Sequence, residues 1–289
     1  MFQRKAPQNL NDCFLNQQER GGPVVYFFRI HACSAAVLAF IRAYYEAAET
    51  YGVVIEGRIP NPGETNLDYY DEIMGAAFQM HPGFFAESLA KWMPGMQKSQ
   101  REAVAASMYD ALDALRKAGK NENMLKNAYV KFMCWLYYRF SGVADGPRGG
   151  CTPKILYEGE ISRYELMLLS ILSSAGCDVV LLSYQGDAAC RRIDPSGDGC
   201  ETFFVPDGEA FPASFSLKWL RENRKEQMKQ ARLYGPAPQI AGCTNAWISG
   251  KGFADVMADV SERGNDPKLF YNCFIRMNGV EDKLTYQSS

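Results

Sequence analysis

The stretch PKILYEGEISRYELMLLSILSSAGCDVVLLSY, residues 153–184, decides the fold. Its opening apolar run ends at Gly159 and predicts a strand. The helix predicted over Ser162–Ala175 has apolar residues at helical spacing, and Glu165 stands where a capping box needs it. Asp178–Tyr184 is a nearly continuous apolar run, typical of a parallel strand covered on both faces. Together these pieces predict a strand–helix–strand unit with parallel strands.

Other segments extend this pattern in both directions. Val24–Ile30 is rich in β-branched and aromatic residues and predicts a buried strand. Ser34 has the residue type of an N-cap for a helix that runs to about Thr50. From Leu67 to about Phe140 the apolar spacing is helical throughout.

These patterns predict an α/β fold, a Rossmann-like parallel sheet with a helical insertion. We expect the following organisation: a loose N-terminal lead-in at 1–22, a first strand–helix module at 23–66, a helical subdomain at 67–141, a linker at 142–152, a Rossmann-like α/β domain at 153–269, and the start of a second, incomplete repeat at 270–289. The last expectation rests on Phe27–Ala32, whose pattern resembles that of Phe274–Gly279. If the repeat is real, the chain is a truncated member of a longer family.

Composition excludes several classes of function. The 289 residues carry a net charge of −2, so no excess of basic residues favours nucleic acid or an anionic membrane. No apolar run is long enough to span a bilayer and the start lacks a signal-peptide core, so we expect a cytoplasmic protein without membrane contact.

The cysteines and histidines exclude common metal sites. The nine cysteines are scattered without a CxxC pair and predict reduced thiols, although Cys190 and Cys200 leave a redox pair open. The only histidines are His31 and His81, which rules out an HExxH motif and histidine-rich centres. We predict no metal site.

Ligands of parallel sheets bind beyond the carboxyl ends of the strands, which directs attention to residues at those ends. Gly159 would let a ligand approach the backbone, or would only serve a turn. Tyr184 would stack on a ligand where its strand ends. Arg29 and Arg276 would bind an anion, because an arginine in a covered run needs a negative partner; an internal carboxylate is the alternative. The other candidate ligand-binding residues are Asp194, Asn245 and Asn278; for Asp194 a solvated surface loop is the alternative.

A family resemblance rests on three stretches. TPKILYEGEISRYELMLLSILSSAGCDVVLLSY with the following Ile193-Asp194-Pro195, and the paired strings FFRIHA and NCFIRMNGVEDKLTY, resemble the bacterial YceG-like proteins. The resemblance implies a component of a biosynthetic module found with tellurium-resistance and general-stress proteins. Members tend to be longer, which also implies truncation.

We therefore expect a protein that binds a nucleotide-like or phosphorylated metabolite at the carboxyl ends of parallel strands. The alternative is a non-catalytic scaffold that binds partner proteins of the stress system through its helical subdomain. The sequence identifies neither a general base nor a cofactor, so whether the chain is an enzyme stays open.

Overall fold

The computed structural model describes residues 2–60, 68–145, 151–184, 186, 188–195, 197, 199–206 and 208–222. The chain divides into two units, Met1–Phe215 and Ser216–Ser289. Of the second unit only 216–222 are described, and 217–222 are helical. The first unit contains the sheet.

The described strands form one sheet in the order β1-β2-β5-β4-β3, with β6 also paired to β2. Every pairing is parallel. The predicted α/β fold with a Rossmann-like parallel sheet is therefore confirmed. The strands are β1 Gln3–Lys5, β2 Val24–Ile30, β3 Gly52–Glu56, β4 Lys154–Glu158, β5 Asp178–Leu182 and β6 Glu201–Thr202.

The deciding stretch forms the centre of this sheet. β4 and β5 pair in parallel from Lys154 with Asp178 to Glu158 with Leu182, joined by α6 (Arg163–Ser174). Ser162 caps this helix: its hydroxyl accepts from the Glu165 backbone N–H at 3.3 Å, and its own N–H donates to the Glu165 carboxylate at 2.8 Å. The predicted capping box is present.

Strand β2 carries three neighbours. β5 pairs with Phe27–Ile30, and β6 pairs with Phe28 and Arg29 on the opposite edge. β1 pairs with Val24–Tyr26 further back. The sheet order places β1 on the same edge as β6, so these two short strands follow each other along β2.

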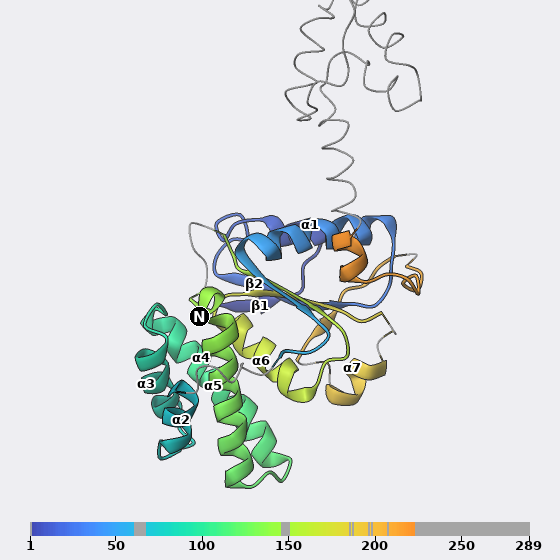
Figure 1. Ribbon diagram of the computed structural model, residues 1–289. Helices are drawn as coiled ribbons and strands as arrows, with labels where there is room; N and C mark the ends of the chain where they lie inside the picture. Colours follow the sequence, from blue (N-terminus) through green and yellow to red (C-terminus); the bar gives the residue numbers. More distant parts are fainter. Residues whose placement is uncertain are drawn as a thin grey trace, which may run out of the picture. The chain divides into compact units, whose positions relative to one another are not determined.

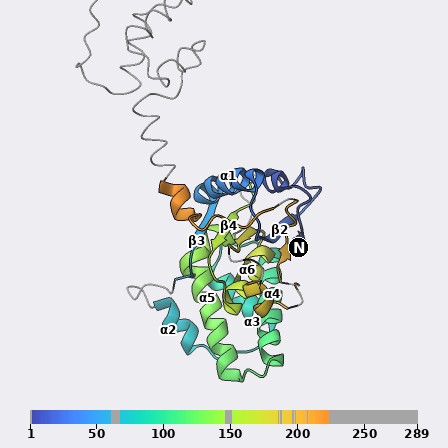
Figure 2. The ribbon, with the colours of Figure 1, turned by 90° about the vertical axis from the view of Figure 1, so that its right-hand side faces the viewer.

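Helices cover both faces of the sheet (Figures 1 and 2). Helix α1 (Ala35–Tyr51) lies on one face, and α6 lies on the other with α4 (Lys98–Lys117), α5 (Glu122–Ala144) and α7 (Ala188–Ile193). Successive side chains of β2 point to opposite faces of the sheet and so contact both helical layers. The Phe28 ring lies 6.2 Å from that of Phe40 in α1, whereas Phe27 belongs to the core shared with α4–α6.

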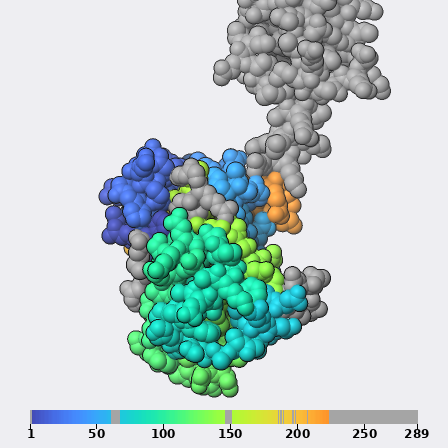
Figure 3. Space-filling view, turned by 90° about the vertical axis from the view of Figure 1, so that its left-hand side faces the viewer, coloured from blue at the N-terminus to red at the C-terminus, as the bar shows by residue number. Residues whose placement is uncertain are grey.

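The helical insertion holds much of the hydrophobic core. It consists of α2 (Asp68–Gly75), α3 (Pro82–Trp92), α4 and α5, and in Figure 3 these helices form one mass below the blue N-terminal segment. Phe85 and Tyr129 stack with ring centroids 5.2 Å apart, and both are fully buried. α2 ends at Gly75, earlier than its apolar pattern predicts.

Three elements differ from the sequence predictions. The segment before Gly21, expected to be a loose lead-in, contains β1 and the 3-10 helix η1 (Leu10–Phe14). β3 begins directly after α1, without a turn that its sequence would signal. α7 directly precedes Asp194, for which a solvated surface loop was the alternative, because the Gly and Asp residues on both sides of this helix are typical of a loop.

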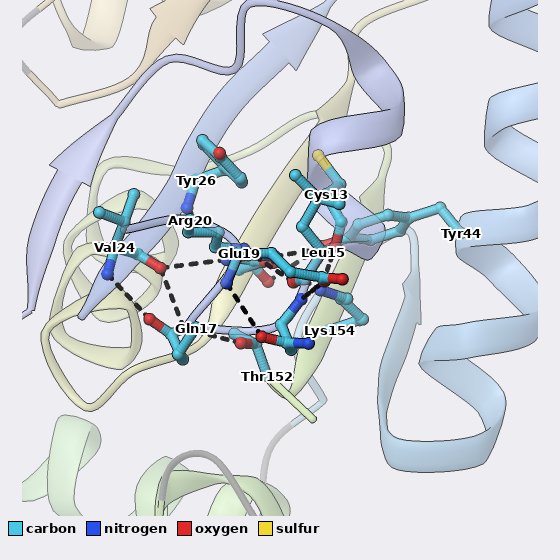
Figure 4. A network of polar contacts seen from close by, with 12 residues as sticks. Cys13, Leu15, Gln17, Glu19, Arg20, Val24, Tyr26, Tyr44, Thr152 and Lys154 are labelled. Atoms are coloured by element: carbon cyan, nitrogen blue, oxygen red, sulfur yellow. Dashed lines mark hydrogen bonds and ion pairs between the residues drawn. The ribbon is translucent and has the colours of Figure 1, made fainter. Parts of the chain in front are cut away.

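A buried network of charges holds the N-terminal segment to the sheet (Figure 4). Both oxygens of Asp178 accept from the Arg20 guanidinium, at 2.8 and 2.7 Å, and Lys154 Nζ donates to the same carboxylate at 2.6 Å. Arg20 and Lys154 also donate to the Cys13 carbonyl, at 2.8 and 2.5 Å. One buried carboxylate thus joins β4, β5 and the segment before β2.

Candidate functional site

At the carboxyl end of β4, Gly159 meets another part of the backbone. Its φ is +122°, and a Cβ atom there would lie 2.8 Å from the Gly57 carbonyl oxygen. Gly57 in turn donates its N–H to the Glu158 carbonyl at 2.7 Å. The absent side chain of Gly159 therefore lets the turns after β3 and β4 pack together.

Tyr184, just beyond β5, packs into an aromatic cluster. Its ring lies 4.9 Å from that of Phe211 and 5.3 Å from that of Phe215, edge to face in both cases. Burial raises the pKa of the Tyr184 phenol, and the neighbouring carboxylates Glu158 and Glu56 raise it further. The Tyr184 ring thus packs against the segment around residues 211–215, and its stacking on a ligand stays a prediction.

Arg29 and Asp194 come together inside the protein. Arg29 Nη1 donates to the Cys200 carbonyl at 2.7 Å and lies 4.0 Å from the Asp194 carboxylate. The same carboxylate accepts the backbone N–H groups of Gly199 and Cys200 at 3.1 and 3.2 Å. Both side chains are buried, so the anion beside Arg29 belongs to the chain itself.

The remaining candidates Asn245, Arg276 and Asn278 lie outside the described residues, as does the predicted repeat at 270–289. Within the described residues, no group of three or more His, Cys, Asp or Glu side chains is placed to hold a metal ion.

Asp194 also lines a groove that the sequence did not predict. The α4–α6 groove is a cavity of about 550 Å³ between α4, α6, the start of the chain and the segment after α7. α4 contributes small side chains, which leave room beside α6. The polar and charged lining residues are Arg4, Ser107, Asp110, Arg163, Ser170, Ser174 and Asp194.

Two arginines give the α4–α6 groove its chemistry. Arg4 extends from β1 across Phe27, with its guanidinium 5.2 Å from the ring centroid, and donates to the Ser170 hydroxyl at 2.9 Å. Arg163, in the first turn of α6, is exposed. Neither arginine forms an ion pair with another described residue. Although Arg4 as a whole is exposed, packing of its guanidinium over Phe27 removes water from it and lowers its pKa.

Sequence patterns missed these residues for a simple reason. Arg4 lies in a polar N-terminal segment and Arg163 in an amphipathic helix, where a solvated arginine is ordinary.

The buried ion pair of Lys154 and Asp178, in contrast, has a signal in the sequence. These two residues are the first of adjacent parallel strands and pair in register. A charge at the start of each apolar strand predicts such a pair.

Comparison with known proteins identifies the family alone. No curated protein and no solved structure matches the chain. None of the described helices is both long and apolar enough to cross a membrane. The model of the YceG domain matches residues 49–207, a range that contains Gly159, Tyr184, Asp194 and the α4 and α6 walls of the groove. This match spans more than half of the sequence, and the chain therefore belongs to the YceG domain family.

Proposed function

We propose that the protein binds a phosphorylated small molecule in the α4–α6 groove, as a component of a stress-linked biosynthetic module. One observation carries this proposal: Arg4 and Arg163 line the same cavity, and neither has an ion pair within the described part of the chain. The ligand is of the phosphorylated class that the sequence predicts. Its proposed binding site is the groove beside Asp194 and not the strand ends around Tyr184.

The groove has suitable size and donors. Its volume of about 550 Å³ lies within the range typical of small-molecule sites. A guanidinium offers parallel N–H donors that match two oxygens of a phosphate. The hydroxyls of Ser107 and Ser170 line the same cavity and add donors of the kind that phosphate oxygens accept, whereas the Ser174 hydroxyl donates to the Ser170 carbonyl at 3.3 Å.

Two acidic residues, Asp194 and Asp110, line the groove and affect its affinity for an anion. Asp194 is engaged by Arg29 and by two backbone N–H groups, which offset its charge. Asp110 is exposed and lines the groove, so it opposes an anion there. Removing that charge should therefore strengthen binding.

Calorimetric titration with inorganic phosphate and pyrophosphate, in buffers of matched ionic strength, tests the proposal. Arg163→Ala should weaken binding by about tenfold or more, as expected for loss of a charged hydrogen bond. Asp110→Asn should strengthen it. Arg116→Ala is the matched control, because Arg116 lies on α4, pairs with Asp113 and does not line the groove.

Two results would overturn the proposal. One is the absence of binding by either phosphate compound to the full chain. The other is an equal loss of affinity in the Arg163→Ala and Arg116→Ala variants, which would show that any surface cation contributes.

The link to stress rests on the family resemblance of residues 153–195 and of the strings FFRIHA and NCFIRMNGVEDKLTY, and it is a separate part of the proposal. Deleting the gene from its host should lower tolerance to tellurite, and the wild-type chain, but not Arg163→Ala, should restore it. Association with tellurium-resistance or stress proteins stays a prediction, which co-purification with the tagged full-length chain would test.

A further inference from the structure

A second cavity adjoins the α4–α6 groove. It has a volume of about 520 Å³ and lies between the first turn of α4 and the segment before β2. Phe2 and Ala103 line both cavities, so the two spaces meet at these residues. We call this second space the amide cavity, because glutamines dominate its polar lining: Gln17, Gln18, Gln97 and Gln100.

Two of these glutamines form a fixed wall. The Gln17 amide donates to the Val24 carbonyl at 3.0 Å and to the Thr152 hydroxyl at 2.8 Å. The Gln100 amide donates to the carbonyls of Asp145 and Ala175, at 2.9 and 3.0 Å. These bonds to three backbone carbonyls and to the Thr152 hydroxyl fix the orientation of both glutamine side chains.

The other polar groups are accessible. Gln18, Gln97 and Ser99 line the amide cavity and are exposed. Their amide and hydroxyl groups both donate and accept hydrogen bonds. Among the described residues that line this cavity there is no arginine or lysine, and Asp145 is the one charged residue. Its chemistry therefore suits an uncharged polar group, in contrast to the groove beside it.

Phe2 stands at the junction of the two cavities. Its ring is partly exposed and lines both of them. An aromatic side chain beside a polar cavity offers a face on which a planar or pyranose-like ring stacks. Such a ring would place its polar edge against the exposed amides.

We infer that the phosphorylated ligand has a second part, an uncharged polar ring that occupies the amide cavity and stacks on Phe2. This inference rests on the proposed phosphate site in the α4–α6 groove and identifies the ligand attached to that phosphate. A nucleobase and a sugar share the required chemistry.

Titration of the full chain with four probes separates these possibilities: inorganic phosphate, ribose 5-phosphate, adenosine 5′-monophosphate and adenosine. Adenosine 5′-monophosphate should bind about tenfold or more tightly than inorganic phosphate, since stacking of one base on an aromatic ring has this magnitude. An equal gain with ribose 5-phosphate would assign the ring to a sugar.

Variants locate the ring within the protein. Gln97→Ala should remove most of the gain of the organic phosphates while leaving the affinity for inorganic phosphate unchanged, because Gln97 lines only the amide cavity. Phe2→Leu, at the junction of the two cavities, should also remove most of this gain. Arg163→Ala should weaken all three phosphates alike. Lys98→Ala is the matched control for Gln97→Ala, because Lys98 is an exposed neighbour that does not line the amide cavity. Circular dichroism would confirm that each variant is folded.

The outcomes distinguish the inference from the function on which it rests. If the three phosphates bind equally, or if Phe2→Leu changes none of them, the ring inference is wrong and the phosphate site stands. If inorganic phosphate does not bind, the proposed phosphate site is wrong. Tight binding of adenosine in that case would show that the amide cavity alone binds a ligand.

Discussion

The guanidinium of Arg29 and the carboxylate of Asp194 lie 4.0 Å apart in the interior of the first unit. Each was predicted from the sequence as a separate ligand-binding residue. The pairing arises because the chain after β5 passes through α7 to β6, which pairs with β2 on the edge that contains Arg29. The carboxylate therefore neutralises the buried arginine from within.

Asp194→Asn should destabilise the protein by about 3 kcal/mol, at the lower end of the cost of removing one partner of a buried pair. The Cys200 carbonyl still accepts from Arg29 in this variant, which limits the loss. Urea unfolding of Asp194→Asn, Arg29→Met and the double variant measures the coupling. Additive effects would contradict the pair, and loss of phosphate binding without loss of stability would make Arg29 a ligand-binding residue.

The sheet could be predicted where local and global preferences agree. β2 and β5 are covered on both faces, so their apolar runs are continuous and visible in the sequence. β1 has three exposed polar residues and does not resemble a strand. β3 has a β-branched run, Val53–Ile55, but it follows α1 without an intervening turn signal. A Cβ atom on Gly52 would lie 1.9 Å from the Lys154 carbonyl, and this contact with the next strand is what requires the glycine.

The candidate site depended on contacts that no local pattern contains. The α4–α6 groove brings together residues from β1, two helices and the segment after α7. Such a site exists only after the crossover of β5 to β6 has placed Asp194 beside α6. In contrast, the capping box at Ser162 and Glu165 is local, and the sequence predicted it correctly.

The charge network at Asp178 predicts unequal losses of stability for two substitutions. Asp178→Asn should cost about 3–5 kcal/mol, because it leaves Arg20 and Lys154 buried without a carboxylate. Lys154→Met should cost much less, since Arg20 also donates to both acceptors of Lys154, the Asp178 carboxylate and the Cys13 carbonyl. Denaturant unfolding compares them; equal losses would show that the lysine is indispensable.

Gly159→Ala tests whether this glycine serves the fold. The substitution places a Cβ atom 2.8 Å from the Gly57 carbonyl oxygen at a φ of +122°, so it should cost about 3 kcal/mol. Gly119→Ala is the matched control: its φ is +83° with nothing within 4 Å, and it should cost about 1 kcal/mol. If Gly159→Ala leaves the melting temperature unchanged and weakens ligand binding, the glycine contacts the ligand instead.

The buried thiol of Cys134 predicts a loss of stability in alkali. Burial raises the pKa of this α5 side chain from its usual value near 9 to about 11. Between these values the unfolded chain releases a proton that the folded protein keeps, so the free energy of unfolding falls as pH rises, by up to about 1.4 kcal/mol per pH unit from this group. Below pH 9 both states are protonated and this contribution is constant.

Urea unfolding at pH 8, 9 and 10 measures this dependence. Cys134→Ala should flatten the decrease between pH 9 and 10 relative to the wild type, at some cost in stability at every pH because the substitution removes buried sulfur. Cys151→Ala is the matched control, because Cys151 is exposed and its loss should leave the slope unchanged. Equal slopes in the wild type and Cys134→Ala would show that the Cys134 thiol ionises in the folded protein as readily as in the unfolded chain.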